Sequence, residues 1–233
     1  MKFLYLLLDI ASFSIPFLFS FHPKLKFYKY WKPLVLGTLI TIFIFIPWDI
    51  LFTINNIWGF NNDYLIGIKI FSLPLEEWLF FILIPYACIF MHYALLELFP
   101  KIELQRKSSN IITNILIMVF ALIAISNYDK WYTLVNFSYA TLLLLIVKVY
   151  NPSVLKYYFL TFPVMLIPFF IVNGILTGSS IENQVVWYNN NENLGIRLFT
   201  IPIEDTVYAF SMILANLSIT QFFFSKWNLP KSN

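Results

Sequence analysis

Two pairs of adjacent acidic residues stand in otherwise apolar surroundings in this sequence. Glu76 and Glu77 follow a proline at the start of one long apolar run, and Glu204 and Asp205 follow a proline at the start of another. Carboxyl groups inside apolar segments are costly to bury, so they usually face the interior of a bundle and serve a function. Because a positioned carboxyl group can deliver or accept a proton, the two pairs indicate general acid–base chemistry.

The two acid pairs belong to one repeated segment. Residues 60–77 (FNNDYLIGIKIFSLPLEE) align without a gap to residues 188–205 (YNNNENLGIRLFTIPIED), and seven of the eighteen positions are identical. We interpret the shared asparagines as turn formers, the shared glycines as positions of special backbone angle or close packing, and the shared prolines as first-turn residues of helices. These paired positions are Asn61 and Asn189, Asn62 and Asn190, Gly67 and Gly195, and Pro74 and Pro202.

A purely structural interpretation of the acid pairs stays open. An acidic residue just behind a proline meets the positive end of the helix dipole, and Ser72 and Thr200 could satisfy free backbone N–H groups there. Against this interpretation, an adjacent pair of acids in both copies is more than a dipole requires. Adjacent residues diverge by about 100° around a helix, so one member of each pair can face the interior while its neighbour supports it.

Polar residues upstream of each acid pair extend the match between the two halves. Asp49 precedes Thr53 by four residues, and Asn173 precedes Thr177 by four residues. We expect Asp49, Asn173 and Thr177 to contribute to the pocket that the acids face. The change from Asp49 in the first half to Asn173 in the second indicates that the two halves are not equivalent.

Tryptophans near the ends of the apolar runs have two interpretations. Trp48, Trp58, Trp78 and Trp187 fit interfacial anchors better than aromatic platforms for a substrate. We keep Trp48 and Trp78 as candidates for substrate binding. His92 lies in the far half of its apolar run, away from the acids, and is predicted to be structural.

Several classes of site are excluded by what the sequence lacks. One cysteine and two histidines among 233 residues provide neither a disulfide framework nor a conventional zinc centre. The six glycines form no G-x-G-x-x-G motif, so no dinucleotide site is predicted, and no acidic motif of the kind that holds Mg²⁺ on a diphosphate is present. The net charge of +3 has no basic patch that indicates nucleic acid. We expect no metal and no evident cofactor, and a non-redox requirement for a reduced flavin stays open.

The elements that must position these residues are long apolar helices. The chain is 60% hydrophobic and 12% charged, with a mean hydropathy of +0.75, and its apolar runs are long enough to cross a bilayer. These runs lie near 2–20, 33–53, 74–97, 110–127, 132–149, 155–177 and 202–224. Asp9 and Pro16 argue against reading the first run as a signal peptide. The sequence therefore predicts an all-α, polytopic membrane bundle of about seven transmembrane helices.

Lysine and arginine residues predict the orientation of these helices. With the N-terminus outside, the inner loops and the C-terminal tail hold eleven Lys and Arg residues, against four in the outer segments. The positive-inside rule then favours an outer N-terminus and a cytoplasmic C-terminus. We expect a multi-pass protein of the cell (inner) membrane.

The repeat also predicts how the chain is organised. The first three helices correspond to the fifth, sixth and seventh, and the fourth serves as a connector. We predict a first repeat over residues 1–100, a connector over 101–131 and a second repeat over 132–233. Because the shift is an even number of helices, the two three-helix repeats are parallel and related by an axis along the membrane normal.

The paired elements resemble a known family of membrane enzymes. Pro74-Leu75-Glu76-Glu77 and Pro202-Ile203-Glu204-Asp205 resemble the P-x-E-E/D signature of heterodimer-type lycopene cyclases, in a form in which both halves are fused. Asp49 and Asn173-x-x-x-Thr177 resemble further elements of that family. The resemblance implies a lycopene β-cyclase-type intramolecular lyase or isomerase of carotenoid biosynthesis, which cyclises ψ end groups without net redox change.

The resemblance also implies the substrate and the partners. The substrate would be lycopene or a related linear carotenoid, and relatives that act on C50 carotenoids share the motifs, so the chain length stays open. The partners would be the lipid bilayer and other membrane enzymes of carotenoid biosynthesis.

On this resemblance, Glu76 and Glu204 are expected to act as acid or base, with Glu77 and Asp205 as tuning partners. We expect the two halves to enclose one cavity, with Glu76 and Glu204 facing it from opposite sides. Aromatic faces would stabilise the cation that cyclisation creates. Two other functions stay open: a small transporter coupled to a proton or solute, and a non-catalytic subunit that binds a lipophilic molecule.

Overall fold

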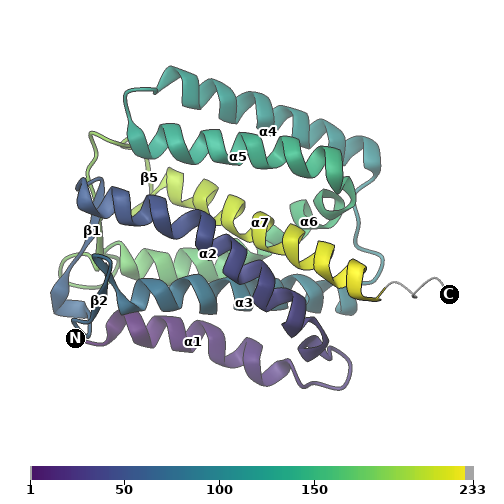
Figure 1. Cartoon of the computed structure of the whole chain (residues 1–233). Helices are drawn as coiled ribbons and strands as arrows, with labels where there is room; N and C mark the ends of the chain where they lie inside the picture. The colour runs from purple at the N-terminus through teal and green to yellow at the C-terminus, as the bar shows by residue number, and fades with distance from the viewer. Residues whose placement is uncertain (1, 229–233) are drawn as a thin grey trace.

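The computed structural model describes residues 2–228, and this part of the chain folds into seven α-helices that run along one bundle (Figure 1). They are α1 (Leu4–Phe19), α2 (Trp31–Ile54), α3 (Leu75–Leu98), α4 (Arg106–Ser126), α5 (Trp131–Tyr150), α6 (Pro152–Leu176) and α7 (Ile203–Asn228). A short 3₁₀ helix, η1 (Phe27–Tyr30), leads into α2, and a second, η2 (Asn62–Tyr64), lies between α2 and α3. Every helix begins and ends within four residues of an apolar run that the sequence predicts.

The helices have the length and composition of a multi-pass membrane protein. Six of them, α2 to α7, are long and apolar enough to cross a bilayer, whereas α1, with 16 residues, is shorter. The start of α1 and the end of α7 lie at opposite ends of the bundle (Figure 1). Large apolar side chains cover the outer faces; Phe43, for example, is 81% exposed. The predicted all-helical bundle is therefore found, with six rather than seven helices of spanning length.

Short strands gather at one end of the bundle, which we call the strand end. Strand β1 (Trp58–Phe60) pairs antiparallel with β4 (Val186–Tyr188), and so joins the segment after α2 to the segment after α6. Gly59 lies opposite Trp187 in this pair. A Cβ atom at position 59 would lie 2.3 Å from the Trp187 ring, so only glycine allows the two strands to approach this closely.

Two matching hairpins precede α3 and α7. They consist of β2 (Lys69–Ile70) with β3 (Leu73–Pro74), and of β5 (Arg197–Leu198) with β6 (Ile201–Pro202). Gly67 and Gly195 adopt φ angles of 96° and 69°, a region that glycine enters without steric cost. The backbone N–H of Leu75 donates to Ile68 O, and that of Ile203 donates to Ile196 O. Each hairpin thus folds back on the first turn of the helix that carries an acid pair.

The packing of α2 against α7 depends on small and polar residues. A Cβ atom at Gly37 in α2 would lie 2.5 Å from Thr220 Oγ1 and 3.1 Å from the backbone oxygen of Asn216, both in α7. Asn216 Nδ2 donates to Thr38 Oγ1 at 3.1 Å. Small residues with interhelical hydrogen bonds are typical of close helix pairs in membranes, and this pair connects the first half of the chain to the second.

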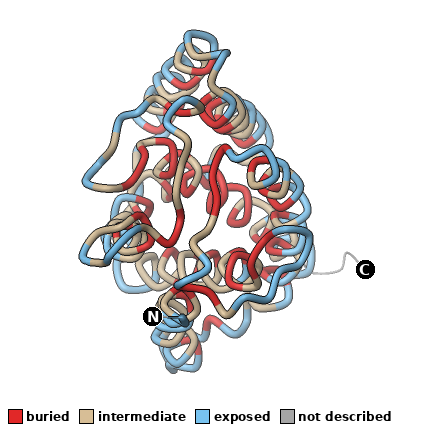
Figure 2. The backbone as a smooth tube through the Cα atoms, turned by 90° about the vertical axis from the view of Figure 1, so that its left-hand side faces the viewer, coloured by how far each residue is buried: buried red, intermediate tan, exposed pale blue. Residues whose placement is uncertain are grey.

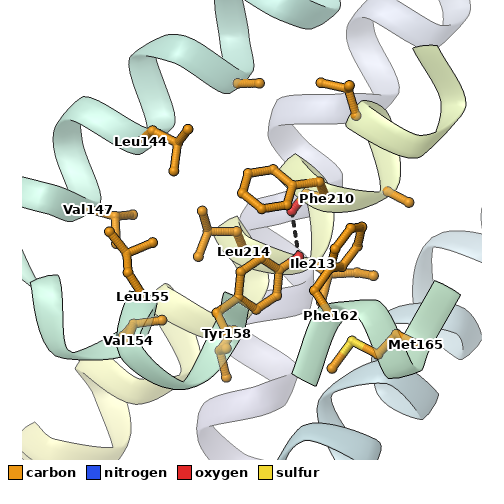
Figure 3. Close-up of a cluster of buried hydrophobic side chains, with 14 of the residues drawn as sticks. Leu144, Val147, Val154, Leu155, Tyr158, Phe162, Met165, Phe210, Ile213 and Leu214 are labelled. Atoms are coloured by element: carbon orange, nitrogen blue, oxygen red, sulfur yellow. Dashed lines mark hydrogen bonds between the residues drawn. The ribbon is translucent and has the colours of Figure 1, made fainter. Parts of the chain in front are cut away.

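The largest apolar core runs through the bundle and reaches the end opposite the strand end. Figure 2 shows the buried residues at the centre of the bundle and the exposed residues around it. Side chains from the end of α5, the start of α6 and the middle of α7 interdigitate there (Figure 3). Tyr158 is fully buried in this core, and its hydroxyl donates to the backbone oxygen of Phe210 at 2.7 Å. Residues of both halves of the chain therefore share this core.

The contact between α2 and α7 gives a first prediction. Gly37→Ala forces the added methyl group against Thr220, and overpacking of this kind costs about 1–3 kcal/mol. We expect a lower unfolding temperature of the purified protein in detergent micelles. Thr220→Ala in the Gly37→Ala background should recover part of the loss, because it removes the nearest atom of the clash. An unfolding temperature of Gly37→Ala equal to that of Val35→Ala, a change at an exposed position of α2, would contradict the prediction.

Candidate active site

Six acidic side chains are buried in the part of the chain that the structure describes, and they come from four helices. They are Asp9 in α1, Asp49 in α2, Glu76 and Glu77 in α3, and Glu204 and Asp205 in α7, and none is more than 8% exposed. Over residues 2–228, the one ion pair joins Lys156 to Glu103, far from this cluster in the sequence and outside it. No group of His, Cys, Asp and Glu residues within the same range could hold a metal ion. Without a cation, such a cluster must hold protons to limit the repulsion between like charges.

The first member of each acid pair faces the hairpin that precedes its helix. Glu76 Oε1 accepts a hydrogen bond from the backbone N–H of Ile66 at 2.6 Å, and Glu204 Oε1 accepts one from that of Leu194 at 2.7 Å. Thr133 in α5 donates a further hydrogen bond to Glu204 Oε1 at 2.7 Å. These two glutamates therefore hold the incoming loop against the start of the helix.

The second member of each pair faces a cavity. Glu77 and Asp205 both line a cavity of about 720 Å³, whereas Glu76 and Glu204 are not among its lining residues. The structure differs here from the expectation that Glu76 and Glu204 face the cavity. The reason is geometric: adjacent residues diverge by about 100° on a helix, and a backbone amide of the loop just before each hairpin binds the first side chain of each pair.

Hydrogen bonds to the two cavity carboxylates differ in number. Tyr5 in α1 donates to Glu77 Oε2 at 2.7 Å, and Tyr132 in α5 donates to Asp205 Oδ1 at 2.6 Å. Asp205 Oδ2 also accepts hydrogen bonds from Asn173 and Tyr188, each at 2.8 Å. A carboxyl group that accepts from three donors has the pattern of an ionised acceptor, whereas Glu77 has one donor.

The residues that surround Glu77 also differ from those that surround Asp205. Asp9 lies four residues after Tyr5, where Asn136 lies four residues after Tyr132. Asn136 Nδ2 donates to the backbone oxygen of Glu204 at 2.7 Å, whereas both carboxyl oxygens of Asp9 are buried without a hydrogen-bond donor. Acids thus surround the first site and amides surround the second.

Asp49 and Thr177 support the cavity from behind its wall. Asp49 is buried, and its Oδ1 accepts a hydrogen bond from Trp58 Nε1 at 2.8 Å, which orients the indole that lines the cavity. Thr177 ends α6 by donating to the backbone oxygen of Asn173 at 2.8 Å. Asn173 itself lines the cavity, whereas Asp49 and Thr177 do not.

The tryptophans proposed as substrate platforms lie outside the cavity wall. Trp48 stacks on Tyr208 with ring centroids 5.5 Å apart, and Trp78 Nε1 donates to the backbone oxygen of Ile70 at 3.2 Å. The indole that lines the cavity belongs to Trp58, at the beginning of β1. Trp48 and Trp78 do not reach the cavity, because the ring of Trp48 points toward α7 and the ring of Trp78 points toward the hairpin.

The residues that the repeat shares as predicted turn formers lie in the loops and not at the cavity. Asn61 Oδ1 accepts a hydrogen bond from the N–H of Asp63, and Asn189 Oδ1 accepts one from that of Asn191. Asn190 Oδ1 accepts one from Arg197. Of the remaining repeat positions, Asn62 begins η2, while Pro74 and Pro202 end β3 and β6 directly before their helices.

The tyrosines that donate to Glu77 and Asp205, together with Asp9, are not among the site residues that the sequence predicts. The shared spacing of Tyr5 with Asp9 and of Tyr132 with Asn136 is a signal that could have found them. Tyr188 lies in β4, between helices; burial, with a further contribution from Asp205, raises the pKa of its hydroxyl well above the usual range. Tyr188 therefore stays a neutral hydrogen-bond donor to the carboxylate.

The cavity wall is otherwise apolar and aromatic. Its walls come from α1, α3, α6 and α7, and β1 and β4 close it at the strand end. Trp58 packs edge to face against Tyr132 at 5.0 Å, and Tyr132 stacks on Tyr188 at 5.9 Å. An apolar cavity with a few convergent polar groups is the usual form of a small-molecule site. This one suits a hydrophobic molecule that undergoes proton transfer at one end.

One comparison with known proteins gives a match. A family model described as lycopene cyclase matches residues 2–95 and 129–223. The interval between the two matched stretches contains α4. Comparisons with curated proteins and with solved structures give no match.

The role of Glu204 in holding its loop can be tested by stability alone. Glu204→Gln keeps the acceptor oxygen that Leu194 and Thr133 use, so we expect an unfolding temperature close to that of the wild type. Glu204→Leu leaves two buried donors unpaired, at a cost of about 1–3 kcal/mol each, and should lower the unfolding temperature clearly. Thermal unfolding in micelles measures both, with Glu97→Leu at an exposed position as control. Equal unfolding temperatures for the two Glu204 variants would refute the loop-holding role.

Proposed function

The chain belongs to the lycopene cyclase family, and we propose that it is a membrane enzyme that cyclises the ψ end groups of lycopene, or of a related linear carotenoid, to β-type rings. The observation that supports this most directly is the apolar cavity with Glu77 and Asp205 at one end. A long polyene dissolves in the bilayer, and its cyclisation needs only that a proton be given at one carbon and taken from another. The activity is that of an intramolecular lyase, a class of isomerase.

Glu77 is the proposed general acid. Its proton goes to C2 of the terminal C1=C2 double bond, which leaves a cation at C1. The electrons of the C5=C6 double bond then form the C1–C6 bond and move the cation to C5. Loss of the proton from C6 restores a C5=C6 double bond, so one proton enters, one leaves and no electrons are exchanged. The single donor to Glu77 and its acidic neighbours support this role.

Asp205 is the proposed base. It accepts three hydrogen bonds, which suits a carboxylate that is ready to take the proton from C6. Trp58, Tyr132 and Tyr188 line the cavity beside it. Their faces can stabilise the cation between the two proton transfers. Glu76 and Glu204, which we first expected to be acid or base, are assigned to positioning the loops.

The matched contacts of the two halves support a duplicated architecture. The hydrogen bond from Tyr5 to Glu77 corresponds to the one from Tyr132 to Asp205. The first acid of each pair, Glu76 or Glu204, accepts a hydrogen bond from the backbone N–H ten residues before it. We propose two parallel three-helix repeats over residues 1–100 and 132–233, joined by a connector over 101–131. The first half, with its surrounding acids, then gives the proton, and the second half, with its surrounding amides, takes the proton back.

The proposed location is the cell (inner) membrane, with the N-terminus outside. On this topology the strand end, and with it the acid cluster, lies near the outer surface. The proposed chemistry involves no net oxidation or reduction, and it calls on no cofactor for the proton transfers. Association with other membrane enzymes of carotenoid biosynthesis would deliver the substrate from one protein to the next.

Removing the proton-transfer ability of each cavity acid tests the mechanism. Glu77→Gln and Asp205→Asn keep the size of the side chains, and each should lower the rate of cyclisation by about 10²-fold or more, the low end of what general acid–base catalysis contributes. The measurement is the ratio of cyclised to linear carotenoid in lycopene-producing cells, normalised to the amount of membrane protein. Glu76→Gln and Glu204→Gln are the matched controls and should retain most of the activity. Loss confined to the controls would reverse the assignment of roles within each pair.

Asp9 offers a test of the acidic surroundings of Glu77. The second half of the chain carries Asn136 at the matching position, so Asp9→Asn should be accepted structurally. If Asp9 helps to keep Glu77 supplied with a proton, Asp9→Asn should lower the rate by about tenfold, which corresponds to about 1.4 kcal/mol, with an unchanged unfolding temperature. Asn136→Asp provides the reciprocal variant. Full activity of Asp9→Asn would assign Asp9 a packing role only.

The proposed topology can be tested separately. Reporter fusions at residues 101–107 and at the C-terminal tail should both report a cytoplasmic location, because an outer N-terminus places these segments inside. A periplasmic signal from either fusion would overturn the orientation without affecting the assignment of the active site.

A further inference from the structure

One face of α3 lines the cavity along the whole helix. The lining residues include Glu77, Phe80, Ile84, Met91 and Leu98, which recur at the spacing of a single helical face. Glu77 lies at the strand end and Leu98 ends the helix. The separation of 21 residues between them corresponds to about 32 Å at about 1.5 Å per residue. The cavity is therefore a long channel rather than a compact pocket.

Acidic groups occur at one end of this channel only. The buried acids of the described chain all belong to the cluster around Glu77 and Asp205, and no acid is among the residues that line the channel along α3 between Ile84 and Leu98. α7 contributes to the wall only between Asp205 and Ile213, so the far part of the channel is formed by the other helices. A molecule that fills the channel has its reacting end at the acids and an unreactive remainder along α3.

The channel has an open side between α1 and α6. Both helices pack against α3, but they are not among the helix pairs that pack closely against each other within residues 2–228. At the strand end a cluster that includes Tyr5 and Leu176 closes the gap between them. Beyond this cluster, Ile15 in α1 and Ile171 in α6 line the channel although they are 65% and 62% exposed. Exposed surface of this part of the bundle faces lipid, so the opening leads into the bilayer.

Proline residues mark both edges of this opening. Pro16 in α1 and Pro168 in α6 line the channel, each inside its helix. A proline inside a helix removes a backbone hydrogen bond and bends the helix.

We propose that a linear carotenoid enters this channel sideways from the bilayer, between α1 and α6, and lies lengthwise along α3 with one end group at Glu77 and Asp205. This inference rests on the proposed function and adds the path and the orientation of the substrate. Because acids are present at one end only, each binding event cyclises one end group. The second ring requires the monocyclic product to leave through the same opening and to return with its other end first.

Two substitutions separate this arrangement from entry by another route. Ile15→Trp places a large side chain at the lipid opening, and Leu18→Trp is the matched control, because Leu18 is also on α1 and 67% exposed but does not line the channel. Purified wild-type and variant proteins in liposomes would be supplied with lycopene. We expect Ile15→Trp to lower the initial rate at least about fivefold, which corresponds to about 1 kcal/mol, and Leu18→Trp to retain the wild-type rate. Equal rates for the two variants overturn sideways entry.

The lengthwise orientation has its own measurement. Ala94→Trp fills the far part of the channel, where the unreactive remainder would lie, and Ile82→Trp on the same helix is the control outside the channel. With Ala94→Trp, we expect cyclisation of lycopene to fall at least about fivefold more than cyclisation of a shortened linear carotenoid with the same ψ end groups, again about 1 kcal/mol. Equal losses on both substrates overturn the orientation. Absence of cyclised product from the wild type would instead overturn the proposed function, so the two failures are distinguishable.

Discussion

The burial of six carboxyl groups without a cation is the constraint on which the rest of this structure depends. Each buried acid has to be hydrogen-bonded, share protons with its neighbours, or both, because an isolated charge in an apolar bundle is too costly. The hairpins, the β1–β4 pair and the tyrosines at the start of α1 and α5 all serve this need. They bring backbone amides and hydroxyl groups to the first turns of α3 and α7. The strand end thereby gathers the buried acids of the described chain.

The two adjacent acids of each pair have different roles because their side chains leave the helix in different directions. In both halves the first acid accepts a hydrogen bond from the preceding loop, and the second reaches the cavity. The loop hydrogen bonds fix the first turn of the helix, and the first turn in turn fixes the direction of the second acid. Position and reactivity are therefore supplied by neighbouring residues of the same helix.

The two halves use the same framework with different chemistry. Asp9 and Asp49 around Glu77 correspond to Asn136 and Asn173 around Asp205, and the amides donate where the acids cannot. A symmetric arrangement would give two sites with the same tendency to hold a proton. The observed asymmetry suits a reaction that takes a proton from one site and returns it to the other. The largest apolar core joins residues of both halves, and the channel runs along α3 beside it.

The sequence by itself determined the helices, the repeated segment and five of the six buried acids, with Asp9 as the exception. Helix bounds follow from the apolar runs because each helix satisfies its backbone hydrogen bonds internally and must match the thickness of the bilayer. Only the tertiary structure decided that Glu77 and Asp205, rather than Glu76 and Glu204, face the cavity, and that Trp58 rather than Trp48 or Trp78 lines it. These choices depend on hairpin amides, on tyrosines from α1 and α5, and on a strand pair between the two halves. Such contacts join residues far apart in the chain, and local spacing does not encode them.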